Sequence, residues 1–146
     1  NIVKYNVVEE GCDIAILALG GLFWLGEKVS REIQKISDIK CTLIDPCYAN
    51  RVDTNLLDRL VQTHRLIVTI EDHSIRGGFG AMIAQYYSSS EVKVRNYGFS
   101  KDLPTEFNSE KFMIENGLTA DFITKDILAL IKSSEDKEKI VEKTSN

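Results

Sequence analysis

The stretch DIAILALGG, residues 13–21, is an almost unbroken apolar run that ends at two glycines. A strand that is buried on both faces of a sheet has this composition, because helices cover both of its sides. The sequence therefore predicts a buried strand here. After the glycines, apolar residues recur at intervals of three and four, which predicts a helix of about four turns that packs on the sheet. These residues are Leu22, Leu25, Val29, Ile33 and Ile36.

Three further apolar runs have the length and composition of strands. They are residues 39–44 (IKCTLI), 66–70 (LIVTI) and 92–99 (VKVRNYGF), and residues 3–8 predict an additional edge strand. Asp53 is placed to accept hydrogen bonds at the start of a second helix, residues 77–80 lead into a third, and a last amphipathic helix begins near Thr119. Strands that alternate with helices pair in parallel through right-handed crossovers. The predicted fold class is therefore α/β, a doubly wound and mostly parallel β-sheet with helices on both faces, arranged as a Rossmann-like three-layer sandwich.

Composition narrows the class of protein. The chain has 146 residues, of which 43% are hydrophobic and 27% charged, and this balance is typical of one globular domain. The net charge is −4 and the sequence has no basic run, so it predicts no positively charged surface for nucleic acid. No stretch reaches the roughly 18–20 apolar residues of a membrane helix. Cys12, Cys41 and Cys47 match no metal motif, which is typical of a reduced, cytoplasmic protein. We expect a folded domain at residues 1–133 and a charged, frayed tail at residues 134–146.

Ligands of an open parallel sheet bind beyond the carboxyl ends of its strands. Residues 20–21, 45–48 and 71–78 each follow a predicted strand, and the third segment combines two carboxylates, an imidazole, a guanidinium and the amides of a glycine-led helix start. The candidate contact residues are Glu71, Asp72, His73, Arg76, Gly77 and Gly78. One hypothesis is that these groups hold an anion. The alternative is that the acids pair with the arginine or with a neighbouring subunit, while the glycines let the loop turn.

Other chemically active side chains have structural explanations. Cys47, beside Tyr48, would be a nucleophile only as a thiolate, and a lone cysteine is more often a small packed side chain. His64 is expected to cap a helix end as a cation. Trp24, beside Phe23 and off the apolar stripe, is expected to meet another domain or subunit. The residues thus provide no catalytic, cofactor-binding or metal-binding set, and they favour a binding or assembly domain.

Four motifs, taken in order, resemble the C-terminal domain of the transketolase superfamily. They are EGCDIAILALG at residues 10–20, LIDP at 43–46 with Asp53 seven residues beyond the proline, THRLIVTIED at 63–72, and GGFGA at 77–81. The resemblance spans residues 5–132. Within the superfamily, it is strongest to the 1-deoxy-D-xylulose-5-phosphate synthases.

The resemblance implies a parent enzyme, a transferase that uses thiamine diphosphate and Mg²⁺. Such an enzyme converts pyruvate and glyceraldehyde 3-phosphate to 1-deoxyxylulose 5-phosphate and CO₂, for isoprenoid and thiamine biosynthesis. In that family, N-terminal thiamine-diphosphate-binding and pyrimidine-binding domains carry the cofactor, so this domain would bind none and would not be catalytic alone. It would pack against those domains and support a homodimer, with the candidate loop at residues 71–78 as the contact.

The sequence departs from the family pattern at residues 47–53 and 98–107. The arginine and the second proline that usually follow the second strand are lost, and the usual Gly-x-Pro-Asp-x-Phe pattern after the fourth strand is replaced. These changes leave the acceptor substrate open. The alternatives are the equivalent domain of a 2-oxoacid dehydrogenase β subunit, of an oxoacid ferredoxin oxidoreductase or of another transketolase, and a free-standing α/β module that binds an anionic ligand or a protein partner.

Overall fold

The computed structural model describes residues 2–74, 78–99 and 109–145. Five strands form one sheet in the order β1-β3-β2-β4-β5. Their bounds are β1 Asn6–Glu9, β2 Asp13–Ala18, β3 Thr42–Asp45, β4 His64–Ser74 and β5 Lys93–Phe99. β1 is an edge strand antiparallel to β3, and the other neighbours are parallel. The predicted mostly parallel sheet is therefore confirmed, as is its additional edge strand.

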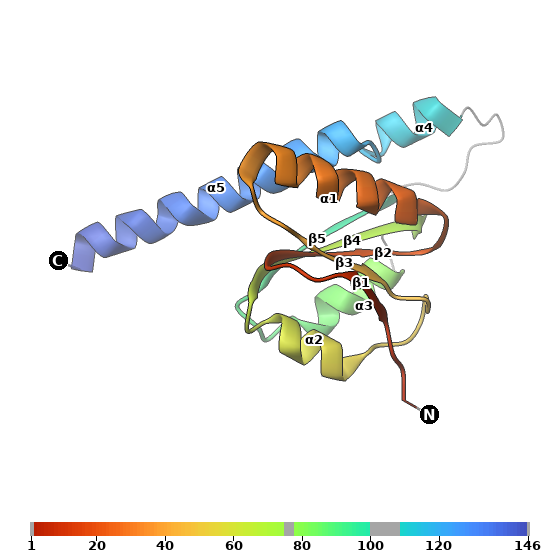
Figure 1. Ribbon diagram of the computed structural model, residues 1–146, viewed down its shortest axis with the longest axis horizontal. Coiled ribbons are helices and arrows are strands. Elements are labelled where there is room, and N and C mark those ends of the chain that lie inside the picture. The colour runs from red at the N-terminus through yellow and green to blue at the C-terminus, as the bar shows by residue number, and fades with distance from the viewer. Residues whose placement is uncertain (1, 75–77, 100–108, 146) are drawn as a thin grey trace.

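Helices cover both faces of this sheet. They are the short 3-10 helix η1 Gly20–Leu22, α1 Phe23–Ser37, α2 Thr54–Leu60, α3 Phe79–Tyr86, α4 Ser109–Glu115 and α5 Ala120–Ser145. In Figure 1, α1 and α5 lie on one face and α2 and α3 on the other, which confirms the three-layer α/β arrangement. None of the helices in the described ranges combines the length and the apolarity needed to cross a bilayer.

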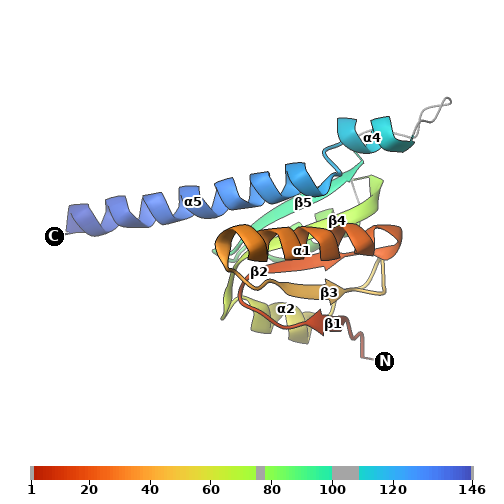
Figure 2. The same cartoon turned by 45° about the horizontal axis from the view of Figure 1, so that its top comes forward.

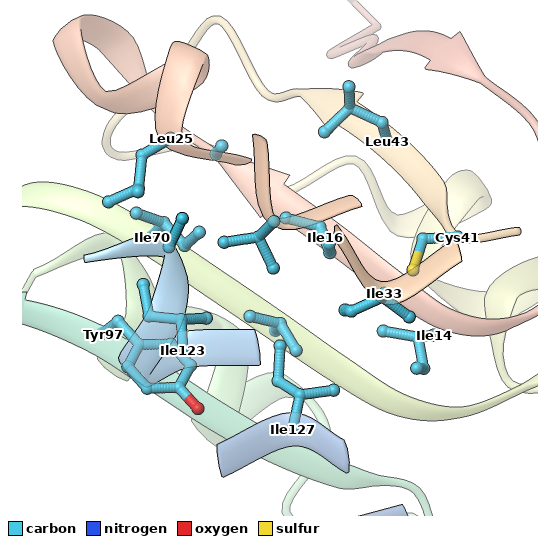
Figure 3. Close-up of a cluster of buried hydrophobic side chains, with 14 of the residues drawn as sticks. Ile14, Ile16, Leu25, Ile33, Cys41, Leu43, Ile70, Tyr97, Ile123 and Ile127 are labelled. Carbon is cyan, nitrogen blue, oxygen red and sulfur yellow. The ribbon is translucent and has the colours of Figure 1, made fainter. Parts of the chain in front are cut away.

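The central strand β2 supplies side chains to both cores, because successive residues of a strand point to opposite faces. Ile14 and Ile16 are completely buried beneath α1 and α5, while Leu17 is buried against α2 and α3. Figure 3 shows the first of these cores between β2 and the two helices. A side chain at Gly26 of α1 has no room, since its Cβ would lie 2.5 Å from the Cβ of Ala18. Helix α1 therefore packs directly on β2.

Asp53 has the capping role that its position predicts. Its Oδ1 accepts a hydrogen bond of 3.0 Å from the backbone N–H of Leu56, in the first turn of α2. Its Oδ2 accepts one of 2.8 Å from the backbone N–H of Tyr5. One carboxylate thus fixes both the start of α2 and the segment that leads into β1.

Several strand boundaries differ from the prediction. β1 covers residues 6–9 rather than 3–8. β3 begins at Thr42 rather than at residue 39, and β4 extends over residues 64–74 rather than 66–70. β4 lies between two parallel neighbours, β2 and β5, and its far end is still paired where Ser74 lies opposite Phe99. Pairing with one neighbour at each end, with β2 at His64 and with β5 at Ser74, therefore extends the strand beyond its apolar run.

The C-terminal region differs more from the prediction than the strands do. Helix α4 was not predicted, and residues 134–145 continue α5 where we expected a frayed tail. Figure 2 shows this part of α5 extending past the sheet. Adding residues to an existing helix requires no new nucleation, and the lysines and glutamates of this segment are good helix formers. The boundary of the domain at residue 133 stays a prediction.

His64 caps a helix end, but not as a cation. Its Nδ1 lies 3.0 Å from the carbonyl oxygen of Leu60 in α2, and its Nε2 lies 2.7 Å from Oγ1 of Thr42 in β3. Burial lowers the pKa of His64 below its usual 6.5, because the charged imidazole loses its hydration. The capping prediction is confirmed and the expected charge is wrong. A neutral ring that donates to the carbonyl and accepts from the hydroxyl joins α2, β3 and β4.

We expect the free energy of unfolding to decrease as the pH falls below 6.5. Between 6.5 and the lowered pKa of the folded state, the unfolded chain binds a proton at His64 and the folded chain does not. The contribution of the neutral His64 to the free energy of unfolding is therefore complete above pH 6.5 and is lost as the pH falls to the lowered pKa. The variant His64→Gln cannot titrate and should show a weaker pH dependence. Urea unfolding of both proteins between about pH 5 and 8 measures the difference. Parallel stability curves would contradict this role for His64.

Candidate functional site

The carboxyl ends of β2, β3 and β4 meet at one edge of the sheet, because the three strands are parallel neighbours. We call this the carboxyl edge. η1 and α1 follow β2 there, the segment 46–53 follows β3, and the loop that leads to α3 follows β4. All three segments that the sequence indicated are thus brought to the same edge.

Glu71 is the most buried charged residue of this edge. Its side chain has no exposed surface, and its carboxylate accepts hydrogen bonds from the backbone N–H groups of Phe79, at 3.0 Å, and Gly80. These N–H groups belong to the first turn of α3, where the helix dipole favours negative charge. Glu71 therefore fills, from inside the chain, the place where a bound anion would lie.

The close contact between β4 and α3 requires a glycine. A Cβ on Gly80 would lie 2.6 Å from Oγ1 of Thr69 and 2.8 Å from Oε2 of Glu71. Thr69 is also fully buried, and its hydroxyl donates a hydrogen bond of 2.7 Å to Oδ1 of Asn96 in β5. A compact polar cluster thus joins β4, β5 and the start of α3.

Asp72 points to the opposite face, as the alternation of a strand requires. Its Oδ2 lies 3.3 Å from the place that a Cβ on Gly21 would take, and its Oδ1 lies 3.9 Å from the equivalent place on Gly20. Its carboxylate thus lies over the glycines that begin η1. Glu71 and Asp72, adjacent at the end of one strand, therefore lie beside helix starts on opposite faces of the sheet, and the hydrogen bonds to a helix start are those of Glu71.

The structure places the predicted contact residues in different settings. Glu71 acts inside the domain, Asp72 is half-buried over η1, and Gly78 is the N-cap residue of α3. The backbone of His73 belongs to β4. Arg76 and Gly77 lie outside the described residues, and so does the expected pairing of the acids with Arg76. Contact with a neighbouring domain stays a prediction for the residues other than Glu71.

The remaining candidates lie on the same edge. Partial desolvation and the negative charge of Asp45 raise the pKa of the Cys47 thiol, so its environment disfavours a thiolate nucleophile. Trp24 is 52% exposed in the first turn of α1, whereas Phe23 packs against the core. The expected surface role therefore fits Trp24 and not its neighbour.

Sequence reasoning missed the cluster of Thr69 and Asn96 and the fixing of the segment after β3. The Tyr5 hydroxyl donates a hydrogen bond to the carbonyl oxygen of Arg51. Both contacts join residues far apart in the chain, and no local spacing signals them. Two features of the sequence point toward the polar cluster. Thr69 alternates with Ile70 in the strand, and Glu71 lies close in the sequence to a glycine-led helix.

The described residues contain no group of three or more His, Cys, Asp and Glu side chains that could hold a metal ion. The buried carboxylate of the edge is engaged with helix α3, which leaves that helix start no place for a diphosphate. The start of α3 therefore does not fit a diphosphate group.

Comparison with known proteins gives consistent matches. The family model "Transketolase, C-terminal domain" matches residues 3–123. A 1-deoxy-D-xylulose-5-phosphate synthase of Francisella tularensis subsp. holarctica (strain FTNF002-00 / FTA) is 28% identical over 132 residues, and one of Pseudoalteromonas translucida (strain TAC 125) is 30% identical over 132 residues. These matches cover 88% and 89% of this chain but 20% of each relative, so the chain spans about a fifth of their length.

A solved structure has a similar fold. It is a split-gene transketolase in an inactive β4 tetramer, and it matches with a TM-score of 0.78 at 22% identity. The match covers 88% of this chain and 42% of that one.

The variant Glu71→Ala should lower the free energy of unfolding by about 2–3 kcal/mol, because it leaves two buried N–H groups without their charged acceptor. Glu71→Gln keeps one oxygen acceptor and should lose less. Urea unfolding measures both, with Glu91→Ala, at an exposed position, as the matched control. Equal unfolding midpoints for Glu71→Ala and the control would show that the contact contributes nothing.

Proposed function

Because the chain belongs to the transketolase C-terminal domain family, we propose that it is the C-terminal assembly domain of a thiamine-diphosphate-dependent transferase. The observation that carries the proposal is the family match together with the internal use of the edge carboxylate Glu71. In this proposal, Glu71 contributes to the rigidity of the domain rather than to the reaction.

The proposed parent enzyme is a 1-deoxy-D-xylulose-5-phosphate synthase. The curated relatives bear this name, and they match nearly all of this chain. The parent would convert pyruvate and glyceraldehyde 3-phosphate to 1-deoxyxylulose 5-phosphate and CO₂ in the cytoplasm. Thiamine diphosphate, when bound, would stabilise the carbanion that the reaction requires. In this proposal, thiamine diphosphate and Mg²⁺ would be held by the other domains of the parent enzyme.

The domain would contribute packing. Its partners would be the N-terminal thiamine-diphosphate-binding and pyrimidine-binding domains and a second copy of the enzyme in a homodimer. The proposed contact lies at the carboxyl edge and uses Asp72, His73, Arg76, Gly77 and Gly78. Glu71 takes part indirectly, because it fixes the start of α3 beside that loop.

The free-standing anion-binding module is not favoured. Its site would have been the glycine-led start of α3, and the carboxylate of Glu71 already accepts the hydrogen bonds of that start. A second negative group there would be repelled and would find those donors in use.

The proposed reaction can be tested on the full gene product that contains this chain. With thiamine diphosphate, Mg²⁺, pyruvate and glyceraldehyde 3-phosphate, we expect formation of 1-deoxyxylulose 5-phosphate and release of CO₂, both measurable by mass spectrometry. Omission of thiamine diphosphate should abolish both products. Exchange of two-carbon units between sugar phosphates without CO₂ release would point to another transketolase, and the absence of any thiamine-diphosphate-dependent turnover would contradict the proposal.

A further inference from the structure

Two exposed aromatic side chains lie in segments that follow neighbouring strands at the carboxyl edge. Trp24 follows β2 and is 52% exposed, and Tyr48 follows β3 and is 38% exposed. β2 and β3 are paired in parallel, with Leu17 opposite Ile44 near their carboxyl ends. The two aromatic residues therefore belong to the same edge of the molecule.

Tyr48 is joined by a cation. The guanidinium carbon of Arg51 lies 5.6 Å from the centre of the Tyr48 ring, which is the geometry of a cation–π contact. Among the described residues, Arg51 has no acidic partner. Its positive charge is therefore not neutralised by any acidic side chain of the described residues.

The segment that carries these side chains is held in place before any partner binds. The carbonyl oxygen of Arg51 accepts a hydrogen bond from the Tyr5 hydroxyl, and Asp53 binds the backbone of Tyr5 and caps α2. In addition, the backbone N–H of Cys47 donates a hydrogen bond of 3.0 Å to Oδ1 of Asp45. A surface loop that is already ordered loses little conformational entropy when it binds.

These residue types are the ones that dominate protein–protein contacts. Tryptophan, tyrosine and arginine are enriched among the residues that contribute most to interface energies. The other strongly exposed apolar residues of the described chain are aliphatic, except for Phe122 of α5, and that helix has no second exposed aromatic residue beside it among the described residues. The combination of two aromatic rings and an arginine is therefore particular to the carboxyl edge.

We propose that Trp24, Tyr48 and Arg51 form the principal contact of this domain with the rest of the parent enzyme, on a surface that offers an apolar pocket and a carboxylate. The inference rests on the proposed function. It is supported by the curated relatives, in which the matched domain makes up about a fifth of the length, so that the proposed parent would have further domains to pack against it. Because the guanidinium of Arg51 has no acidic partner among the described residues, we expect a carboxylate on the partner surface, and the exposed indole of Trp24 calls for an apolar pocket there.

Hydroxyl-radical footprinting of the full gene product tests the inference. Trp24 is the only tryptophan of this chain, and Phe122, with 51% exposure in α5, is an internal reference. After correction for intrinsic reactivity, we expect Trp24 to be oxidised several-fold more slowly than Phe122. Arg51→Glu should restore the labelling of Trp24, whereas Arg31→Glu, an exposed arginine in the middle of α1, should leave it protected.

Equal corrected labelling of Trp24 and Phe122, or no response to Arg51→Glu, would overturn the inference. Protection that disappears on dilution, together with dissociation of a dimer, would assign the surface to a second copy and overturn it as well. The turnover assay separates the two proposals. A gene product that makes 1-deoxyxylulose 5-phosphate with an exposed Trp24 contradicts only this inference, and one that lacks thiamine-diphosphate-dependent turnover contradicts the proposed function.

Discussion

The hydrogen bonds from the backbone N–H groups of Phe79 and Gly80 to the Glu71 carboxylate join the centre of the sheet to the start of α3. A buried carboxylate is costly unless donors and opposite charge surround it, and here the helix start supplies both. This requirement fixes the neighbouring residues. Position 80 has to be a glycine because any Cβ would meet Thr69 and Glu71, and the second core assembles beneath the helix that this contact places.

The same contact determines what the carboxyl edge offers to other molecules. In many parallel sheets, a helix start at this edge binds an anionic ligand. Here the chain's own carboxylate occupies one helix start, and Asp72 lies over the glycines that begin another. Among the described residues, the side chains that the edge exposes include Trp24, Tyr48 and Arg51. An edge of this kind suits contact between domains, which agrees with membership of a family named for a C-terminal domain.

Local sequence patterns predict most of the fold. The apolar run of β2, the three-and-four spacing of α1 and the cap at Asp53 are each specified within a few residues, and the parallel topology follows from their alternation. The charge of His64 could not be predicted, because it depends on burial by elements that come together only in the folded chain. The role of Glu71 escaped prediction for a related reason. Its acidity suggested a surface contact, whereas its partners are backbone groups eight and nine residues away.

Native mass spectrometry of the assembly purified from its source tests the central claim most directly. We expect an assembly in which this domain is joined to thiamine-diphosphate-binding domains, so that the mass is several times the 16.5 kDa of this chain and thiamine diphosphate is released on denaturation. An assembly made only of 16.5 kDa chains without thiamine diphosphate would contradict it.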